Sequence, residues 1–401
     1  MLKKLSLLTA VLFTLPLLAV EGLAAITLAV NVDDQLANVP PHRPLHVPTV
    51  KQVTYGQRFH IRFVILKPKV VNGKINITGT LKKFDPDNSS SIIFKDQQLL
   101  DTRHTGKGVI VSRVILGIEH TPKDPAGVYR YQLTLTDRND GNKTFTAPEN
   151  KVTLVKEASD LKPMERKEFD LLFENYYRSP KPERVLAAFD FLMKFNQQQQ
   201  QAKKKFTPEI TLAWIAEVLK ISPHLQVPFA QKYGKVKGST NRAFVALIVR
   251  GCGGEKAMLP HLSPSIRRYI KRLGKKNPLE VTEVKHGLAM DLLWAKFFAT
   301  GSSEPVKLLI NEMRRREMMT PENARKKEKL SDKEKQAVMN FALCSAACWS
   351  FSSNLQKGHH LLGFYAENMF MTQTLPDKHA GILLANIFKN LQKKQEKKQQ
   401  K

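Results

Sequence analysis

The sequence has little cysteine and lacks the short motifs that mark common reactions. Its 401 residues include three cysteines, which are too few for a disulfide scaffold and form no Cys-x-x-Cys motif for zinc or redox chemistry. There is no Gly-x-Ser-x-Gly elbow and no Gly-Lys-Ser phosphate loop. Two histidine pairs, His42 with His46 and His359 with His360, lack acidic or cysteine partners at ligand spacing. We therefore expect no metal, no cofactor and no catalysis.

Acidic residues are also scarce relative to basic ones. The chain has 36 Asp and Glu against 64 Lys and Arg, which gives a formal net charge of +28. With 42% hydrophobic residues it has enough apolar mass to bury cores, so a disordered or collagen-like chain is excluded. The length favours two or three domains.

The first 24 residues have the three parts of a secretory signal peptide. A basic start with Lys3 and Lys4 is followed by an apolar stretch up to Val20 and then by the small residues Ala24 and Ala25. We predict cleavage after Ala24, and a mature chain that is periplasmic or secreted. An uncleaved anchor helix is the alternative, although the stretch is shorter than the ~20 apolar residues that a membrane span needs.

Residues 25–50 are rich in Pro and His and are expected to be extended, whereas residues 51–156 alternate with a period of two. Apolar residues at 59, 61, 63 and 65, and again at 129, 131, 133 and 135, predict half-buried strands. Six or seven such strands joined by Gly, Pro, Asn and Asp turns predict an antiparallel β-sandwich. The stretch Pro122–Asp137, in which a Pro-Ala-Gly turn precedes a Tyr-containing strand, resembles bacterial immunoglobulin-like modules. The resemblance implies an Ig-like sandwich and no particular ligand.

Residues 157–392 show helical periodicity. Ser331-x-x-Glu334 has the spacing of a capping box at a helix start. Residues 175–192 and 296–313 match at a spacing of 121, with aromatic pairs, a short polar turn and an amphipathic helix in each copy. Stacked units of this kind predict an α-helical repeat, solenoid-like domain, with a non-repetitive bundle as the alternative. The expected fold class is thus multidomain, all-β followed by all-α, with a disordered basic tail at 393–401.

Three segments of the helical part carry a second resemblance. Met290–Gly301, Ala346–Asn354 and Ile210–Pro223 resemble uncharacterised exported bacterial proteins with a helical region of this kind. The resemblance implies a helical-repeat scaffold and supplies no activity.

Four residues of the helical part are expected to be buried for structural reasons. Asp291 and Trp294 lie in an almost wholly apolar helix over 284–298, where a buried carboxylate needs a partner. An enzyme of unrecognised type around Asp291 or His286 is the alternative. Cys344 and Cys348 are four residues apart and share a helix face. Whether Cys252 pairs with either of them stays open.

Two clusters of basic residues are the candidate binding sites. Both would attract anionic polymers or lipid headgroups. The first is predicted to begin on a helix. The clusters comprise Arg267, Arg268, Lys271, Arg272, Lys275 and Lys276, and Arg314, Arg315 and Arg316.

These features favour an exported binding or scaffold protein. We expect its helical surface to bind a protein partner in the cell envelope, with the basic clusters favouring anionic envelope components. A purely electrostatic binder of anionic envelope polymer or lipid headgroups is the alternative, and a general basic bias of the source proteome would give the same charge. Nucleic acid is not expected, since no recognition motif is present and the basic stretches lack interleaved aromatic residues. The oligomeric state stays open.

Overall fold

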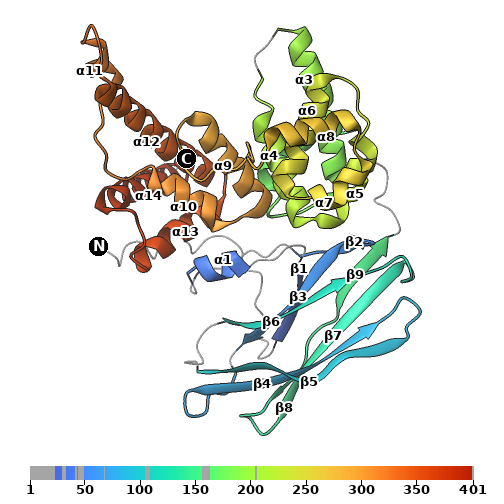
Figure 1. Cartoon of the computed structure of the whole chain (residues 1–401). Helices are drawn as coiled ribbons and strands as arrows, with labels where there is room; N and C mark the ends of the chain where they lie inside the picture. The colour runs from blue at the N-terminus through green and yellow to red at the C-terminus, as the bar shows by residue number, and fades with distance from the viewer. Residues whose placement is uncertain are drawn as a thin grey trace.

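A computed structural model describes residues 23–28, 33–40, 43, 49–66, 68–103, 109–155, 163–203 and 206–399. The strands lie together in the N-terminal part, and the helices that follow form two groups above them (Figure 1). One hydrophobic core lies among the strands and a separate one among the helices. The chain therefore folds around two centres.

The strands form two sheets. In the larger sheet the order is β2-β9-β7-β4-β5, with β8 also on β7, and β2 runs parallel to β9 while the other pairs are antiparallel. The smaller sheet has the order β1-β3-β6. The strands are β1 (Leu23–Leu28), β2 (Gln52–Thr54), β3 (Arg58–Leu66), β4 (Lys74–Phe84), β5 (Ser90–Arg103), β6 (Val109–Glu119), β7 (Gly127–Asp137), β8 (Lys143–Thr146) and β9 (Asn150–Val155).

The prediction of an antiparallel immunoglobulin-like sandwich is wrong. Most strands belong to one mixed sheet of six strands, and the parallel pairing of β2 with β9 departs from an all-antiparallel arrangement. The smaller sheet depends on β1, which comes from the region expected to be a leader and an extended segment. Alternation predicted the faces correctly, since Tyr129, Tyr131 and Leu133 of β7 are buried. It carries no information on which strands become neighbours.

The helices occupy the rest of the chain. They are α2 (Arg166–Asn175), α3 (Val185–Gln201), α4 (Glu209–Ile221), α5 (Gln226–Tyr233), α6 (Ser239–Cys252), α7 (Glu255–Met258), α8 (Pro264–Leu273), α9 (Gly287–Thr300), α10 (Ser303–Asn311), α11 (Pro321–Arg325), α12 (Asp332–Gln356), α13 (His360–Met371) and α14 (Lys378–Gln399), with short 3-10 helices η2 (Pro182–Arg184), η3 (Pro223–Leu225) and η4 (Leu259–His261). No helix in the described part of the chain is both long and apolar enough to span a membrane.

The two matching segments of sequence start near the ends of equivalent helices but do not build a solenoid. Helices α2 and α9 start at residues 166 and 287, a difference of 121 that equals the spacing of the repeat. The two helices pack on one another, and the Tyr177 backbone N–H donates to the Phe298 carbonyl at 3.0 Å. As a result α3–α8 and α9–α14 form two groups side by side, joined by α4 against α9 (Figure 1). The solenoid-like part of the fold prediction is therefore wrong as well.

A short helix, α1 (Asp33–Asn38), ties the N-terminal segment to the second group of helices. Asp34 accepts hydrogen bonds from the Ser303 backbone N–H at 2.6 Å and from its hydroxyl at 2.9 Å. Arg43 donates to both carboxylate oxygens of Glu367, at 2.7 and 3.2 Å. The region that was expected to be extended thus contains β1 and a clasp, in which Asp34 of α1 and the nearby Arg43 bind the second group of helices.

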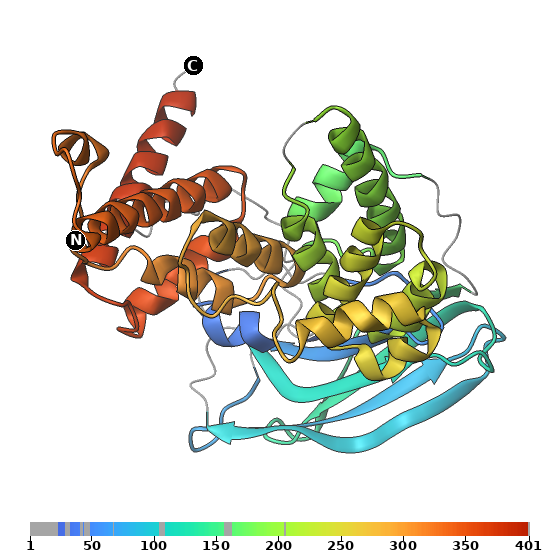
Figure 2. The same ribbon diagram turned by 45° about the horizontal axis from the view of Figure 1, so that its top comes forward.

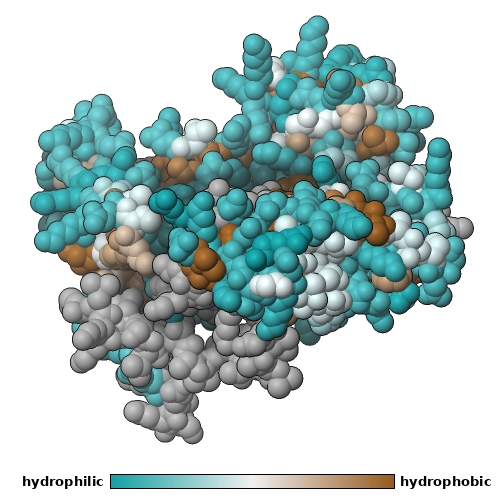
Figure 3. Space-filling view, turned by 90° about the horizontal axis from the view of Figure 1, so that it is seen from below, coloured by the Kyte–Doolittle hydropathy of each residue, from teal (hydrophilic) through white to brown (hydrophobic). Residues whose placement is uncertain are grey.

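The two ends of the chain also differ from expectation. Residues 1–22 of the predicted leader lie outside the described residues, and β1 crosses the predicted cleavage point after Ala24. At the other end α14 continues to Gln399 and extends beyond the helices it packs against (Figure 2), where we expected disorder from residue 393. Seen from below, the molecule presents mostly hydrophilic side chains with separated apolar groups (Figure 3).

Candidate functional site

Helix α8 carries the first basic cluster. It starts after Ser263 with Pro264 in the first turn, which suits a residue that has no backbone N–H, and ends at Gly274 with φ of 60°. Ile266 and Ile270 anchor it in the helical core, where it lies across α6 (Figure 1). Because apolar residues occupy only the inner face, every cation of the helix points outward.

The cations of this cluster are exposed and unpaired. No ion pair joins them to any carboxylate within the described ranges. Arg267 donates through Nε to the Leu262 carbonyl at 2.9 Å, and Arg272 lies 5.9 Å from the centre of the Tyr269 ring. The cluster consists of Arg267, Arg268, Lys271, Arg272, Lys275 and Lys276.

A neighbouring loop adds two further cations. The Ser263 backbone N–H donates to the Gly234 carbonyl at 2.8 Å, which holds the loop containing Lys235 and Lys237 beside the start of α8. Both lysines are exposed. The sequence has no acidic residue from 256 to 279, and the nearest one before it, Glu255, pairs with Arg250 at 2.5 Å. This α8 face, defined as the six cluster residues with Lys235 and Lys237, is therefore wholly cationic.

The second basic cluster and the residues that follow it are partly neutralised by their own neighbours. Arg316 makes two hydrogen bonds with Glu312, at 2.8 and 3.0 Å, and Glu312 is only 2% exposed. Arg314 and Arg315 are exposed, and Arg315 contacts Asp377 through its backbone N–H. The lysines that follow form further ion pairs, namely Lys327 with Glu334, Lys333 with Glu317 and Lys335 with Asp332. The two clusters, which composition did not distinguish, thus differ in available charge.

The residues considered for catalysis do not form a site. Asp291 is exposed near the start of α9, so the prediction that it is buried is wrong, and partial desolvation raises the pKa of its carboxyl. Asp291 lies on the one side of α9 that faces outward, whereas the other sides of this helix are buried. His286 caps α9 by accepting from the Ala289 backbone N–H at 3.2 Å. Trp294 is buried as predicted and stacks on Phe298. Nothing brings Asp291 and His286 onto a common substrate.

All three cysteines are free thiols. Cys344 is buried as predicted, whereas Cys348 is half-buried. The hydrogen bond between them lowers the pKa of Cys344 to about 7 and raises the pKa of Cys348. Cys252 is buried elsewhere, 3.8 Å from the Met258 sulfur, and burial raises its pKa to about 11. The structure therefore contains no bridge from Cys252 to either of the others.

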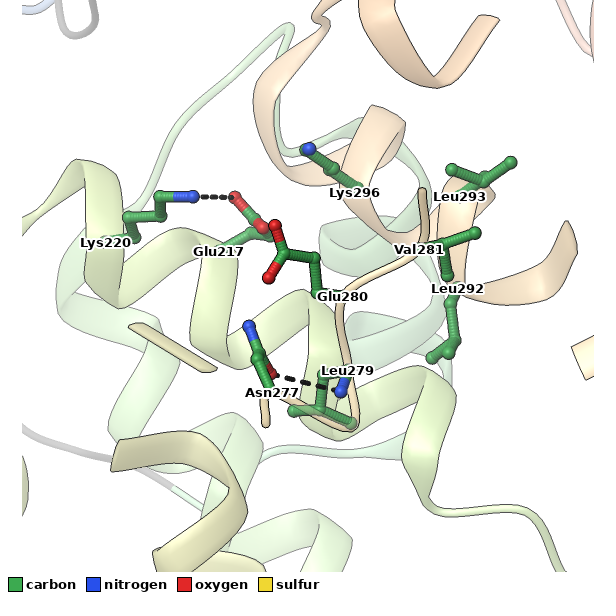
Figure 4. A pocket seen from close by; sticks show the side chains of 9 residues that line it. All are labelled: Glu217, Lys220, Asn277, Leu279, Glu280, Val281, Leu292, Leu293 and Lys296. Carbon is green, nitrogen blue, oxygen red and sulfur yellow. Dashed lines mark hydrogen bonds and ion pairs between the residues drawn. The ribbon is translucent and has the colours of Figure 1, made fainter. Parts of the chain in front are cut away.

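A small polar cavity lies between α4, α9 and the loop after α8. Glu217 and Glu280 point toward one another across it (Figure 4), and Lys220 Nζ lies 3.8 Å from the Glu217 carboxylate. Lys296 is engaged by Glu304 at 2.6 Å. Burial raises the pKa of Glu217. The cavity volume of about 60 Å³ suits one or two waters rather than a substrate.

The sequence does not indicate this cavity, because Glu217 lies in a helix whose other residues are mostly apolar. Among the side chains that the structure describes, no three His, Cys, Asp or Glu residues converge on one point. His359 is buried, and His42 and His46 lie outside the described residues.

Comparisons with known proteins add no functional assignment. No family model and no curated protein matches the chain. Similar solved structures include a family 123 glycoside hydrolase from Clostridium perfringens, with 10% identity, 44% of this chain and 36% of that chain covered, and a TM-score of 0.22. Another is pT26-6p, with 10% identity, 61% of this chain and 46% of that chain covered, and a TM-score of 0.19. The chain spans less than half the length of either, and scores this low support neither a shared fold nor a shared activity.

Proposed function

We propose that this chain is a non-catalytic binding protein that works outside the cytoplasm and binds an anionic component of the cell envelope through the α8 face. The observation that carries the proposal is the contrast between the two basic clusters. The α8 face presents eight cations with no ion-paired carboxylate among the described residues, whereas in the second cluster and the residues that follow it Arg316, Lys327, Lys333 and Lys335 are ion-paired. Unpaired charge on a rigid helix is available to a ligand without breaking internal contacts.

The geometry favours recognition of repeated negative groups. Helix α8 has 10 residues and is about 15 Å long at 1.5 Å per residue. Its outward cations recur every three or four residues and so lie about 5 Å apart along the helix. A phosphate- or carboxylate-bearing polymer, or a layer of anionic headgroups, presents charges that such a row can meet. Between residues 222 and 338, all of which the structure describes, no large apolar side chain is among the exposed ones. The face therefore favours surface attraction without insertion.

Export supports this choice of ligand. The leader-like first 24 residues favour a location where teichoic or lipopolysaccharide-type polyanions and membrane headgroups are the abundant acids, and nucleic acid is not. A protein partner in the envelope stays part of the proposal, with the exposed apolar residues of the helical part concentrated on α12–α14.

The test compares two variants with equal loss of charge. Binding to vesicles of anionic and of zwitterionic phospholipid, and to a soluble anionic polysaccharide, is measured at low and high salt. Each cation near such a surface is worth up to ~1 kcal/mol, so removing four lowers affinity by up to on the order of 1000-fold. The α8 variant carries Gln at Arg268, Lys271, Arg272 and Lys275. The control carries Gln at Arg314 and Arg315 of the second cluster and at Lys326 and Lys329, which follow it in the sequence, and all four side chains are exposed.

We expect the α8 variant to lose binding and the control to keep most of it, with binding of the wild type lost as salt rises. The polysaccharide and vesicle arms separate a polymer ligand from a headgroup ligand. Equal losses in both variants would mean that net charge alone drives binding, and would refute a specific role for α8.

A further inference from the structure

Helix α12 places two thiols one turn apart on the same side. Cys344 and Cys348 lie four residues apart near its middle, and the Cys348 thiol donates a hydrogen bond to the Cys344 sulfur. Cys344 is 7% exposed and Cys348 is half-buried, so a small reagent from solvent reaches the pair from the side of Cys348. The third cysteine, Cys252, is buried elsewhere beside Met258.

Charged groups from two other segments act on Cys344. Arg316 lies in the turn after α10 and His379 at the start of α14, and α12 packs on both of these helices (Figure 1). The Arg316 guanidinium and the protonated His379 ring favour the Cys344 thiolate, whereas the Glu312 carboxylate opposes them. Glu312 holds Arg316 through two hydrogen bonds, and His379 Nδ1 lies 3.0 Å from the Met313 carbonyl oxygen. A fixed donor and fixed cations beside a thiol are the environment of reactive cysteines.

The thiolate form of Cys344 is therefore available at neutral pH. The hydrogen bond from Cys348 and the two cations outweigh burial and lower the pKa of Cys344 to about 7. Burial raises the pKa of Cys252 to about 11. Because the thiolate is the form that attacks peroxides and disulfides, Cys344 is the reactive thiol of the three.

A disulfide across this turn of helix would be strained. Side chains four residues apart on a helix have Cβ atoms about 5–6 Å apart, whereas a disulfide holds its Cβ atoms at about 3.5–4.5 Å. Joining Cys344 to Cys348 therefore distorts the turn and breaks the helical hydrogen bond between their backbone groups. Strained disulfides are readily reduced, which is typical of regulatory rather than structural bridges.

We propose that Cys344 and Cys348 form a thiol switch, which a hydroperoxide converts to a disulfide and which then opens the middle turn of α12. Cys344 is the attacking thiol, and Cys348 is the thiol that resolves the intermediate. Since α12 packs on α10, α13 and α14, opening this turn loosens the second group of helices. The switch is separate from the α8 face, which belongs to the first group.

The reaction balances with one hydrogen peroxide for two thiols. The Cys344 thiolate attacks one peroxide oxygen, the O–O bond breaks, and the departing hydroxide takes the proton of the Cys348 thiol to form water. Cys348, now a thiolate, attacks the sulfur of the Cys344 sulfenic acid. The S–O bond breaks as the S–S bond forms, and the second hydroxide takes a proton from solvent. The two sulfurs together lose two electrons, and the peroxide is reduced to two waters.

The test treats the full chain with hydrogen peroxide at pH 7 and follows each cysteine by peptide mass spectrometry. We expect Cys344 and Cys348 to form one intrachain disulfide, and glutathione to restore both thiols. Cys344 should react on the order of 100-fold faster than Cys252, because its larger thiolate fraction outweighs the lower nucleophilicity of a thiolate of low pKa.

Two substitutions at Cys348 separate its two roles. Cys348→Ser keeps a hydroxyl donor and cannot form the disulfide, so the reaction should stop at a sulfenic acid on Cys344 that dimedone traps. Cys348→Ala removes the donor as well, so the pH at which the rate reaches half of its maximum should move upward. Cys252→Ala is the matched control and should leave both the rate and the product unchanged.

Hydrogen exchange measures the change in α12. The amide protons of the turn between the two cysteines should exchange faster in the oxidised chain and return to their former rates after reduction. Reaction at Cys344 no faster than at Cys252, or a disulfide between two chains, would overturn the proposal. So would an intrachain disulfide that leaves hydrogen exchange in α12 unchanged.

Discussion

His359 provides a pH-dependent prediction that can be worked out in detail. Its side chain is 1% exposed, and its Nδ1 lies 3.0 Å from the Tyr177 hydroxyl. Arg178 Nε donates to that hydroxyl at 2.9 Å, so the hydroxyl proton is directed to His359 Nδ1. Burial, reinforced by Arg178 and Lys357, lowers the pKa of His359 to about 3. Protonation at Nδ1 would also remove the acceptor that Tyr177 uses.

The sign and size of the effect follow from proton binding in the two states. The unfolded chain binds a proton on this histidine near pH 6.5, whereas the folded chain does not until about pH 3. The free energy of unfolding therefore falls as the pH drops below 6.5. At about 1.36 kcal/mol per pH unit, the loss between pH 7 and pH 5 is about 2 kcal/mol.

Urea unfolding of the wild type and of His359→Gln at pH 7, 6 and 5 measures this term. The variant lacks the titrating group. The difference in free energy of unfolding between the wild type and the variant should therefore shrink by about 2 kcal/mol from pH 7 to pH 5. Tyr177→Phe is the matched control: it should lower stability by about 1 kcal/mol at every pH and keep the wild-type slope, because burial is the main cause of the shift. Parallel pH profiles for wild type and His359→Gln would refute the reasoning.

Two further predictions concern the N-terminal segment. Asp34→Ala should lower the free energy of unfolding by about 2 kcal/mol in urea titrations, because the Ser303 N–H and hydroxyl lose their acceptor at a residue that is almost fully buried. Asp34→Asn should lower the free energy of unfolding by less than Asp34→Ala does. Equal stability of the wild type and both variants would contradict a role for the clasp. When the chain with its leader is expressed in a bacterium, mass spectrometry of the envelope fraction should find Ala25 as the first residue. Intact chain beginning at Met1 in the cytoplasm would contradict export.

Local structure was predictable from the sequence where the pattern depends on near neighbours. Alternation around Phe59–Ile65 predicted a strand, and β3 spans Arg58–Leu66. The capping box at Ser331 and Glu334 is present at the start of α12. Strand order and helix packing were not predictable, because period-two and period-3.6 patterns define faces without defining partners.

The same distinction applies to the candidate sites. The α8 cluster was predicted because its cations lie on the polar face of a short amphipathic helix. The pairing of Arg316 with Glu312 was missed because both residues lie in the turn after α10, where no helical spacing indicates partners. Asp291 was assigned to the interior because its neighbours in sequence are apolar, while the outward direction depends on what covers each side of α9.

The clasp formed by α1 joins residues that are made far apart in time. Asp34 and Arg43 emerge early, yet Ser303 and Glu367 follow 269 and 324 positions later. During synthesis the N-terminal arm therefore cannot close until most of the polypeptide has been made. Chains cut short before that point would lack the partners that hold the arm, and such an untied end is where proteolysis concentrates.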